Sequence, residues 1–134
     1  MDSRLLLGFI GEDLCACISH SRVEDDLGAK SFKLAYGFDG PIRTLQAVAV
    51  STSHRGRGGA VADEAMSRAL DDIITREAGV ETLVTAKIDI RNEPSEAMAG
   101  RHGFEPLSAI PATHPLRGWY VLVGASEEEA ELAD

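Results

Sequence analysis

A glycine-rich turn joins an apolar strand-like run to a long helical pattern, and this junction constrains the fold more than any other feature. Residues 55–60 read Arg-Gly-Arg-Gly-Gly-Ala, after the apolar run 45–50 and before a helical pattern that spans 60–78. Such a turn leaves backbone N–H groups free at a helix N-terminus, where the helix dipole adds positive potential. The junction therefore predicts a loop that binds phosphate.

Two common phosphate-binding loops do not fit this segment. A P-loop requires the pattern G-x-x-x-x-G-K-[ST], which the sequence does not contain. A dinucleotide fingerprint that starts at Gly56 needs its third glycine at position 61, and that residue is Val61. The predicted ligand is therefore a phosphate-bearing cofactor that is held in neither of these two ways.

The rest of the pattern predicts an α/β (α+β) domain on a mixed sheet. Apolar residues form one helical stripe over 60–78, and Gly79 follows at a C-cap position. A second helix is expected over 93–102, with Asn92 as its N-cap and Gly103 after its end. The expected strands are 4–10, 14–19, 43–51, 82–88, 104–110 and 118–123, and 32–38 is a short strand or irregular. The strand–helix–strand unit 43–88 should be parallel with a right-handed crossover.

Length and charge indicate one domain, 1–125, followed by an acidic tail, 126–134. The chain has 134 residues and a net charge of −9. Five acids lie in the last eight residues, and the remaining 17 acidic and 13 basic residues give −4. This balance argues against nucleic acid as the main partner. We expect no membrane span and no leader peptide in this sequence, which makes the cytoplasm the predicted location.

The two cysteines are not expected to form a disulfide or a metal site. Cys15 and Cys17 would project from the same face of one strand, where small buried thiols are common. The sequence has no Cys/His cluster with zinc-ligand spacing. We therefore predict no metal.

Two separated motifs resemble signatures of the GNAT superfamily of acyl-CoA N-acyltransferases. Residues 55–60 resemble its Q/R-x-x-G-x-G/A loop, and the preceding strand ends at the family's distance from the loop. Residues 92–104 resemble a second signature, in which an Asn is followed by a small residue, an apolar residue and a Gly-Phe pair, here Asn92, Ser95, Met98, Gly103 and Phe104. The resemblance covers about 42–123 and the hairpin before it. It implies two splayed parallel strands, 43–51 and 82–88.

The resemblance also implies a site for acetyl-CoA between the splayed strands. Backbone groups of Val48 and Val50 would pair with the pantetheine arm. The loop would hold the pyrophosphate through backbone N–H groups, small residues and side-chain charge, which involves Arg55, Gly56, Arg57, Gly58, Gly59 and Ala60. Asn92 and Ser95 would lie near the pantetheine or the adenosine phosphate. Without a ligand, the glycines could serve a tight turn and Asn92 could serve only as a helix cap.

The chain departs from the family where acid–base catalysis is expected. Many members carry a Tyr that protonates the leaving thiolate, and this sequence has Ala99 at that position. The strand 43–51 contains no acid that could act as a base. Candidates for proton transfer are Asp89, His54 and Tyr120, with His20 as a further possibility. An N–H near Val50 is expected to stabilise the oxyanion.

The function implied is N-acetyltransferase activity, with direct transfer of an acetyl group from acetyl-CoA to a primary amine. The alternative is a non-catalytic CoA-binding or scaffold protein of the same fold. Family members usually begin with a strand and two helices that precede the hairpin, and this sequence starts close to the hairpin. A partner subunit would then cover the sheet, so we expect a homodimer.

Overall fold

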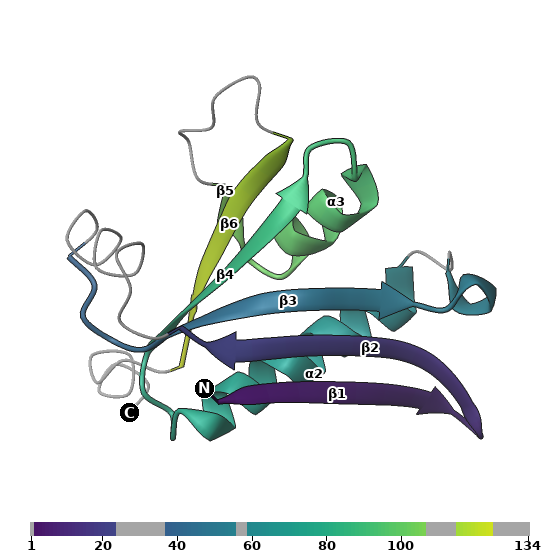
Figure 1. Cartoon of the computed structure of the whole chain (residues 1–134), viewed down its shortest axis with the longest axis horizontal. Helices are drawn as coiled ribbons and strands as arrows, with labels where there is room; N and C mark the ends of the chain where they lie inside the picture. The colour runs from purple at the N-terminus through teal and green to yellow at the C-terminus, as the bar shows by residue number, and fades with distance from the viewer. Residues whose placement is uncertain (1, 24–36, 56–58, 107–114, 125–134) are drawn as a thin grey trace, which may run out of the picture.

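The computed structural model describes residues 2–23, 37–55, 59–106 and 115–124. Within them, six strands form one mixed sheet in the order β1-β2-β3-β4-β6-β5 (Figure 1). The strands are β1 (Ser3–Ile10), β2 (Asp13–Arg22), β3 (Ile42–Val50), β4 (Thr82–Asp89), β5 (Glu105–Pro106) and β6 (Leu116–Val123). The helices are α2 (Ala60–Arg76), α3 (Glu93–Arg101) and the short 3-10 turn η1 (Thr52–His54). The predicted mixed α+β fold, including the parallel β3–β4 pair, is confirmed.

Several predicted boundaries differ from the observed ones. Helix α2 ends at Arg76 rather than at 78, because Ala78 and Gly79 both adopt positive φ angles, 56° and 76°. β2 continues to Arg22. The expected strand 104–110 is described only as far as Pro106, so 107–110, like 32–36 and the tail from 125, lies outside the described residues.

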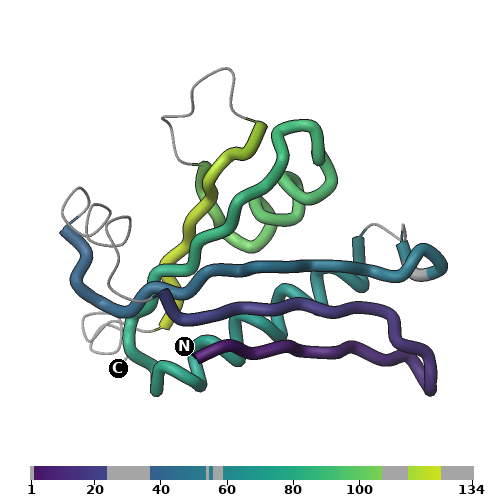
Figure 2. The backbone as a smooth tube through the Cα atoms, in the orientation of Figure 1, coloured from purple at the N-terminus to yellow at the C-terminus, as the bar shows by residue number. Residues whose placement is uncertain are grey.

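The main core lies between one face of the sheet and both helices. Figure 2 shows α2 running behind the β1–β2–β3 part of the sheet and α3 beside β4. Apolar residues from every layer form one buried cluster: Ile18, Leu45, Met66, Ala69, Ile73, Val84, Met98, Ala99, Phe104 and Trp119. The helical stripe in the sequence therefore faces this core, as its 3.6-residue period predicts. Ile42 and Leu83 belong to a smaller cluster, on the other face of the sheet.

Two irregularities interrupt the pairing of the first three strands. Between β1 and β2 the register shifts at Cys15, whose thiol donates a hydrogen bond to the Gly8 carbonyl. Between β2 and β3 it shifts at Gln46, which has no opposite residue on β2. A bulge of this kind bends the strand that carries it. Both cysteines are free, and Cys15 is buried while Cys17 is half-buried.

A network of charged residues fastens α2 to β2 and β3. The Arg43 side chain is fully buried and donates to the Glu77 carboxylate at 2.7 Å and to His20 Nδ1 at 3.1 Å. His20 Nε2 lies 2.8 Å from the Asp72 carboxylate. Because arginine only donates, His20 Nδ1 must accept, so the proton is on Nε2 and His20 is neutral. Burial also lowers the pKa of His20, which favours the neutral ring within this network.

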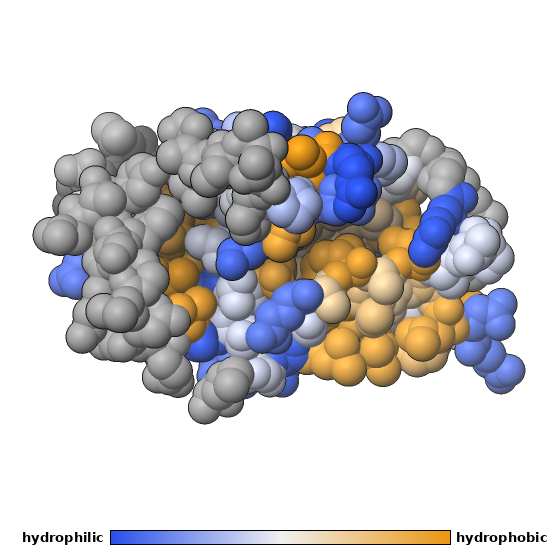
Figure 3. All heavy atoms as spheres, turned by 45° about the horizontal axis from the view of Figure 1, so that its top comes forward, coloured by the Kyte–Doolittle hydropathy of each residue, from blue (hydrophilic) through white to orange (hydrophobic). Residues whose placement is uncertain are grey.

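The face of β1 away from α2 is apolar and open in the described part of the chain. Leu5, Leu7 and Phe9 alternate along β1, and each side chain is more than half exposed. Leu14, which neighbours Phe9 on β2, is exposed to a similar degree. Figure 3 shows a continuous apolar area on the side of the molecule that it draws.

Candidate functional site

Strands β3 and β4 separate soon after they begin to pair. They pair in parallel at only three positions, the last of which is Thr44 with Thr85. β3 then continues to Val50 and β4 to Asp89 without further pairing to each other, and Figure 1 shows the two strands diverging. The bulge at Gln46 begins two residues beyond Thr44 and bends β3 there. The splayed parallel pair expected from the resemblance is therefore present, and the bulge gives a local cause for it.

A cavity of about 780 Å³ occupies the opening between these strands. Six of the ten residues predicted to bind the cofactor line it: Val48, Val50, Arg55, Gly59, Asn92 and Ser95. A smaller cavity of about 180 Å³ adjoins it toward the point of separation and shares Val48, Asn92, Ser95 and Met98 with it. Residues that are 44 positions apart in the sequence, such as Val48 and Asn92, thus meet in one cleft.

Gly59 caps helix α2 in a conformation that suits glycine. Its φ angle is 79°, in the left-handed region. A Cβ atom at this position would lie 2.9 Å from an Arg101 guanidinium nitrogen, so the position is also crowded. Gly56, Arg57 and Gly58, the centre of the predicted loop, lie outside the described residues.

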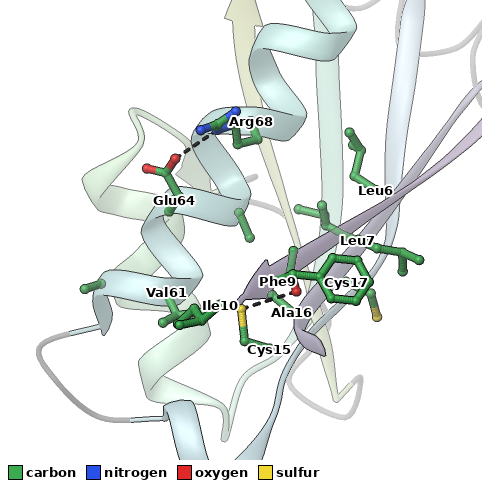
Figure 4. A pocket seen from close by; sticks show the side chains of 14 residues that line it. Leu6, Leu7, Phe9, Ile10, Cys15, Ala16, Cys17, Val61, Glu64 and Arg68 are labelled. Atoms are coloured by element: carbon green, nitrogen blue, oxygen red, sulfur yellow. Dashed lines mark hydrogen bonds and ion pairs between the residues drawn. The ribbon is translucent and has the colours of Figure 1, made fainter. Parts of the chain in front are cut away.

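Ala60 does not line this cleft, and its predicted backbone contact to the pyrophosphate stays a prediction. It lies on a second cavity of about 530 Å³, between the β1–β2 hairpin and α2. Figure 4 shows this cavity, with Ile10, Cys15 and Val61 around it and the Glu64–Arg68 ion pair at its edge. Ala62, which does line the cleft, is two residues further along α2, so about 200° of helical rotation place it on a different side of the helix from Ala60.

Two arginines, Arg55 and Arg101, lie at the rim of the cleft. Arg55 Nε donates to the Val50 carbonyl at 3.0 Å, which holds the side chain against the end of β3. Arg101 bonds to the Asp63 carboxylate at 2.9 Å, and its hydrogen bonds hold the pKa of Asp63 below the usual value. Arg101 was not predicted as a site residue. It lies within the second motif, three residues after Met98, and this helical spacing was the available signal.

Asn92 and Ser95 have a structural role as well as a place in the cleft. The Asn92 side chain accepts a hydrogen bond from the Ser95 backbone N–H at 3.2 Å and so caps α3. Both residues also line the two cavities. The two interpretations of Asn92, cap and site residue, are therefore compatible.

The residues predicted as candidates for proton transfer lie in different parts of the molecule. Asp89 lines the smaller cavity, but Arg91 binds its carboxylate through the side chain and the backbone, which lowers the pKa of Asp89 to about 2. Such a carboxylate is a weak base. Tyr120 lies on the face away from the helices, where its hydroxyl donates to Glu105 at 3.0 Å. The side chain of His54 lies outside the described residues, and Ala99 is buried in the core.

Solved acetyltransferases have a similar overall fold. An acetyltransferase of the GNAT family from Streptococcus pneumoniae superposes with a TM-score of 0.64 over 92% of this chain and 68% of its own, at 11% identity. The ribosomal-protein-S18-alanine N-acetyltransferase from Escherichia coli gives 0.65 over 92% and 71%, at 14% identity. This chain has the GNAT acetyltransferase fold. A Salmonella typhimurium protein of similar structure, solved with its cofactor acetyl-CoA, gives 0.60 over 92% and 65%, at 16% identity.

The chain matches no protein-family model and no curated protein. In the described ranges, no helix is long and apolar enough to cross a membrane. Those ranges also contain no group of three or more potential metal ligands.

Proposed function

We propose that this protein is an acetyl-CoA-dependent N-acetyltransferase that acts on a primary amine. The observation that carries the proposal is the cleft between β3 and β4, because the GNAT-like motifs predicted it and six of the predicted residues line it. The structural likeness to acetyltransferases supports the same activity class. The proposal also includes specificity for primary amines and direct transfer of the acetyl group from acetyl-CoA to the amine.

A free strand edge, small apolar walls and positive charge in the cleft support the proposal that it binds CoA. The edge of β3 beyond Thr44 has no strand partner in β4, so its backbone groups are available to the amides of a pantetheine arm. Val48, Ala62 and Met98 provide apolar or small walls. Gly59 and the two rim arginines, Arg55 and Arg101, would lie at the phosphate end, near the N-terminus of α2.

We infer that the reacting end of the cleft lies near the bulge. β3 rises about 3.3 Å per residue, so Val50 lies roughly 16 Å along the strand from Leu45. Since the glycine-rich loop follows Val50, the phosphates belong there and the acyl group belongs near residues 45–47. We therefore assign oxyanion stabilisation to backbone N–H groups around Gln46, rather than to the N–H near Val50.

Bound acetyl-CoA would supply an activated acyl group as its thioester. In the proposed transfer, the uncharged amine nitrogen would form a bond to the carbonyl carbon, the carbon–sulfur bond would break, and a proton from the nitrogen would end on the departing sulfur. Ala99 offers no hydroxyl for this proton, and Asp89 with a pKa of about 2 is poorly suited to remove one. We expect the rate to rise with pH as the free amine deprotonates. A bell-shaped profile centred near neutral pH would show instead that a positioned acid–base pair exists.

Cofactor binding is tested by thermal unfolding with CoA. At a hundredfold excess over Kd, binding adds about 2.7 kcal/mol to stability, a shift of several degrees. Ala62→Glu places a carboxylate in the cleft and should abolish the shift, whereas Ser67→Glu adds the same charge at an exposed position of α2 and should keep it. An unchanged wild-type melting curve at saturating CoA would disprove the cofactor assignment.

Turnover is tested separately, by release of free CoA thiol with a panel of primary amines. Release above the hydrolysis background supports the transferase. CoA binding without amine-dependent release supports the second candidate, a non-catalytic CoA-binding protein of this fold. Ala99 and the Asp89–Arg91 pair are the observations that favour the second candidate.

A further inference from the structure

Four polar side chains form a row across the sheet where β3 and β4 separate. Thr44 pairs with Thr85, Thr85 pairs with Tyr120, and Tyr120 pairs with Glu105 on β5. Directly paired residues of neighbouring strands project from the same face of a sheet. The residues that alternate with them are buried in the core beneath the helices: Val84, Phe104 and Trp119. The row therefore lies on the opposite face, at the end of the cleft assigned to the acyl group.

Glu105 is an exposed carboxylate with a defined position in this row. The Tyr120 hydroxyl donates to its Oε2 at 3.0 Å, which holds the carboxylate above the sheet. Strands in a sheet are spaced about 4.8 Å apart, so Glu105 lies two spacings, roughly 10 Å, from β4. The carboxylate therefore lies on the same face as the point of separation, but too far along the sheet to contact an amine that reacts there.

On this face, the positive charge of Lys87 lies close to the cleft and the negative charge of Glu105 lies farther from it. Lys87 is exposed and lies on the same face as Thr85, two residues further along β4. Its positive charge disfavours a second cation close to the reacting centre and so favours the uncharged form of an amine there. Glu105, two strands away, favours a cation instead. Asp89, at the end of β4, is already paired with Arg91.

We propose that Glu105, positioned by Tyr120, binds a second cationic group of the acceptor, which makes linear diamines and longer polyamines the substrate class. The inference rests on the proposed N-acetyltransferase function. An uncharged reacting nitrogen lies at the point of separation near Lys87. An ammonium several methylene groups away reaches Glu105 and forms a charge-assisted hydrogen bond.

The test compares a linear eight-carbon diamine with n-butylamine as acceptors, using thiol release by the intact chain. We expect the wild type to have the higher kcat/KM for the diamine. Glu105→Gln should lower that value by about ten- to a hundredfold, mainly through KM, because a hydrogen bond to a charged group is lost. Butylamine kinetics and the thermal shift with CoA should stay unchanged. Tyr120→Phe should act in the same direction with a smaller effect.

Glu12→Gln, which neutralises an exposed carboxylate in the β1–β2 turn, is the matched control and should keep the diamine preference. Equal kcat/KM of the wild type for both amines, or an unchanged preference in Glu105→Gln, would overturn the inference while leaving the transferase intact. No turnover with either amine, despite stabilisation by CoA, would overturn the transferase and this inference together.

Discussion

Replacing Arg43 with methionine should destabilise the protein severely, because its guanidinium neutralises a buried carboxylate. Arg43 is fully buried, and its Nε donates to Glu77 at 2.7 Å. Among the described residues, Arg22 would remain as a cation near Glu77, with its Nη1 at 3.8 Å from the carboxylate and its side chain half exposed. The substitution also removes the donor to His20 Nδ1 and a contact with Asp2. The methionine side chain has a similar length and fills the space, but the buried Glu77 carboxylate keeps its negative charge without its main partner.

Breaking a buried ion pair by removing one partner costs about 3–5 kcal/mol. For a domain of this size, 1 kcal/mol corresponds to about 3–5 °C in Tm, so we expect a decrease of about 10–20 °C. Urea unfolding followed by circular dichroism measures the free energy directly. Arg43→Met combined with Glu77→Gln should recover part of the loss, since no buried charge then remains unpaired.

Arg68→Met is the control, because Arg68 forms an exposed helical pair with Glu64 and its loss should leave Tm nearly unchanged. A loss below about 1 kcal/mol for Arg43→Met would show that the buried pair contributes little beyond its desolvation cost. A double variant no more stable than Arg43→Met would show that the unpaired carboxylate is not the cause.

Three further predictions concern pH, assembly and the tail. Burial lowers the pKa of His20 in the folded protein, so on acidification the unfolded chain binds a proton at this histidine first. The free energy of unfolding should therefore fall as the pH drops below about 6.5. His20→Gln should remove this part of the loss, as measured by urea unfolding at several pH values. The open apolar face of β1 should be covered by a second copy, so light scattering should give twice the 14.3 kDa monomer mass, and Leu7→Glu should give the monomer. A wild-type monomer would show that this face needs no partner. Truncation after Ser126 should leave Tm and CoA binding unchanged, whereas a large loss of either would show that the acidic tail docks on the domain.

The sequence by itself determined the elements and the two motifs of the proposed site. Local chemistry decides these features: the helical stripe from 60 to 78, the Asn92 cap and the turn-forming glycines act over a few residues. The resemblance of these motifs to the GNAT signatures then implied a cleft that brings Val48 and Asn92 together, and both residues line one cavity in the structure. The sequence identity to the solved acetyltransferases is low, but backbone groups provide most contacts of the proposed cofactor site, and these do not depend on side-chain identity.

Only the tertiary structure decided the contacts between strands and the charges around them. The bulge at Gln46, which accompanies the separation of β3 from β4, depends on register with β2 and has no local sequence signature. His20 resembled a catalytic candidate until packing placed it between Arg43 and Asp72, where burial keeps it neutral. Glu105 and Tyr120 are 15 residues apart and gain a shared position only through strand pairing. Long-range pairing sets these environments, and the environment rather than the residue type decides what each group can do.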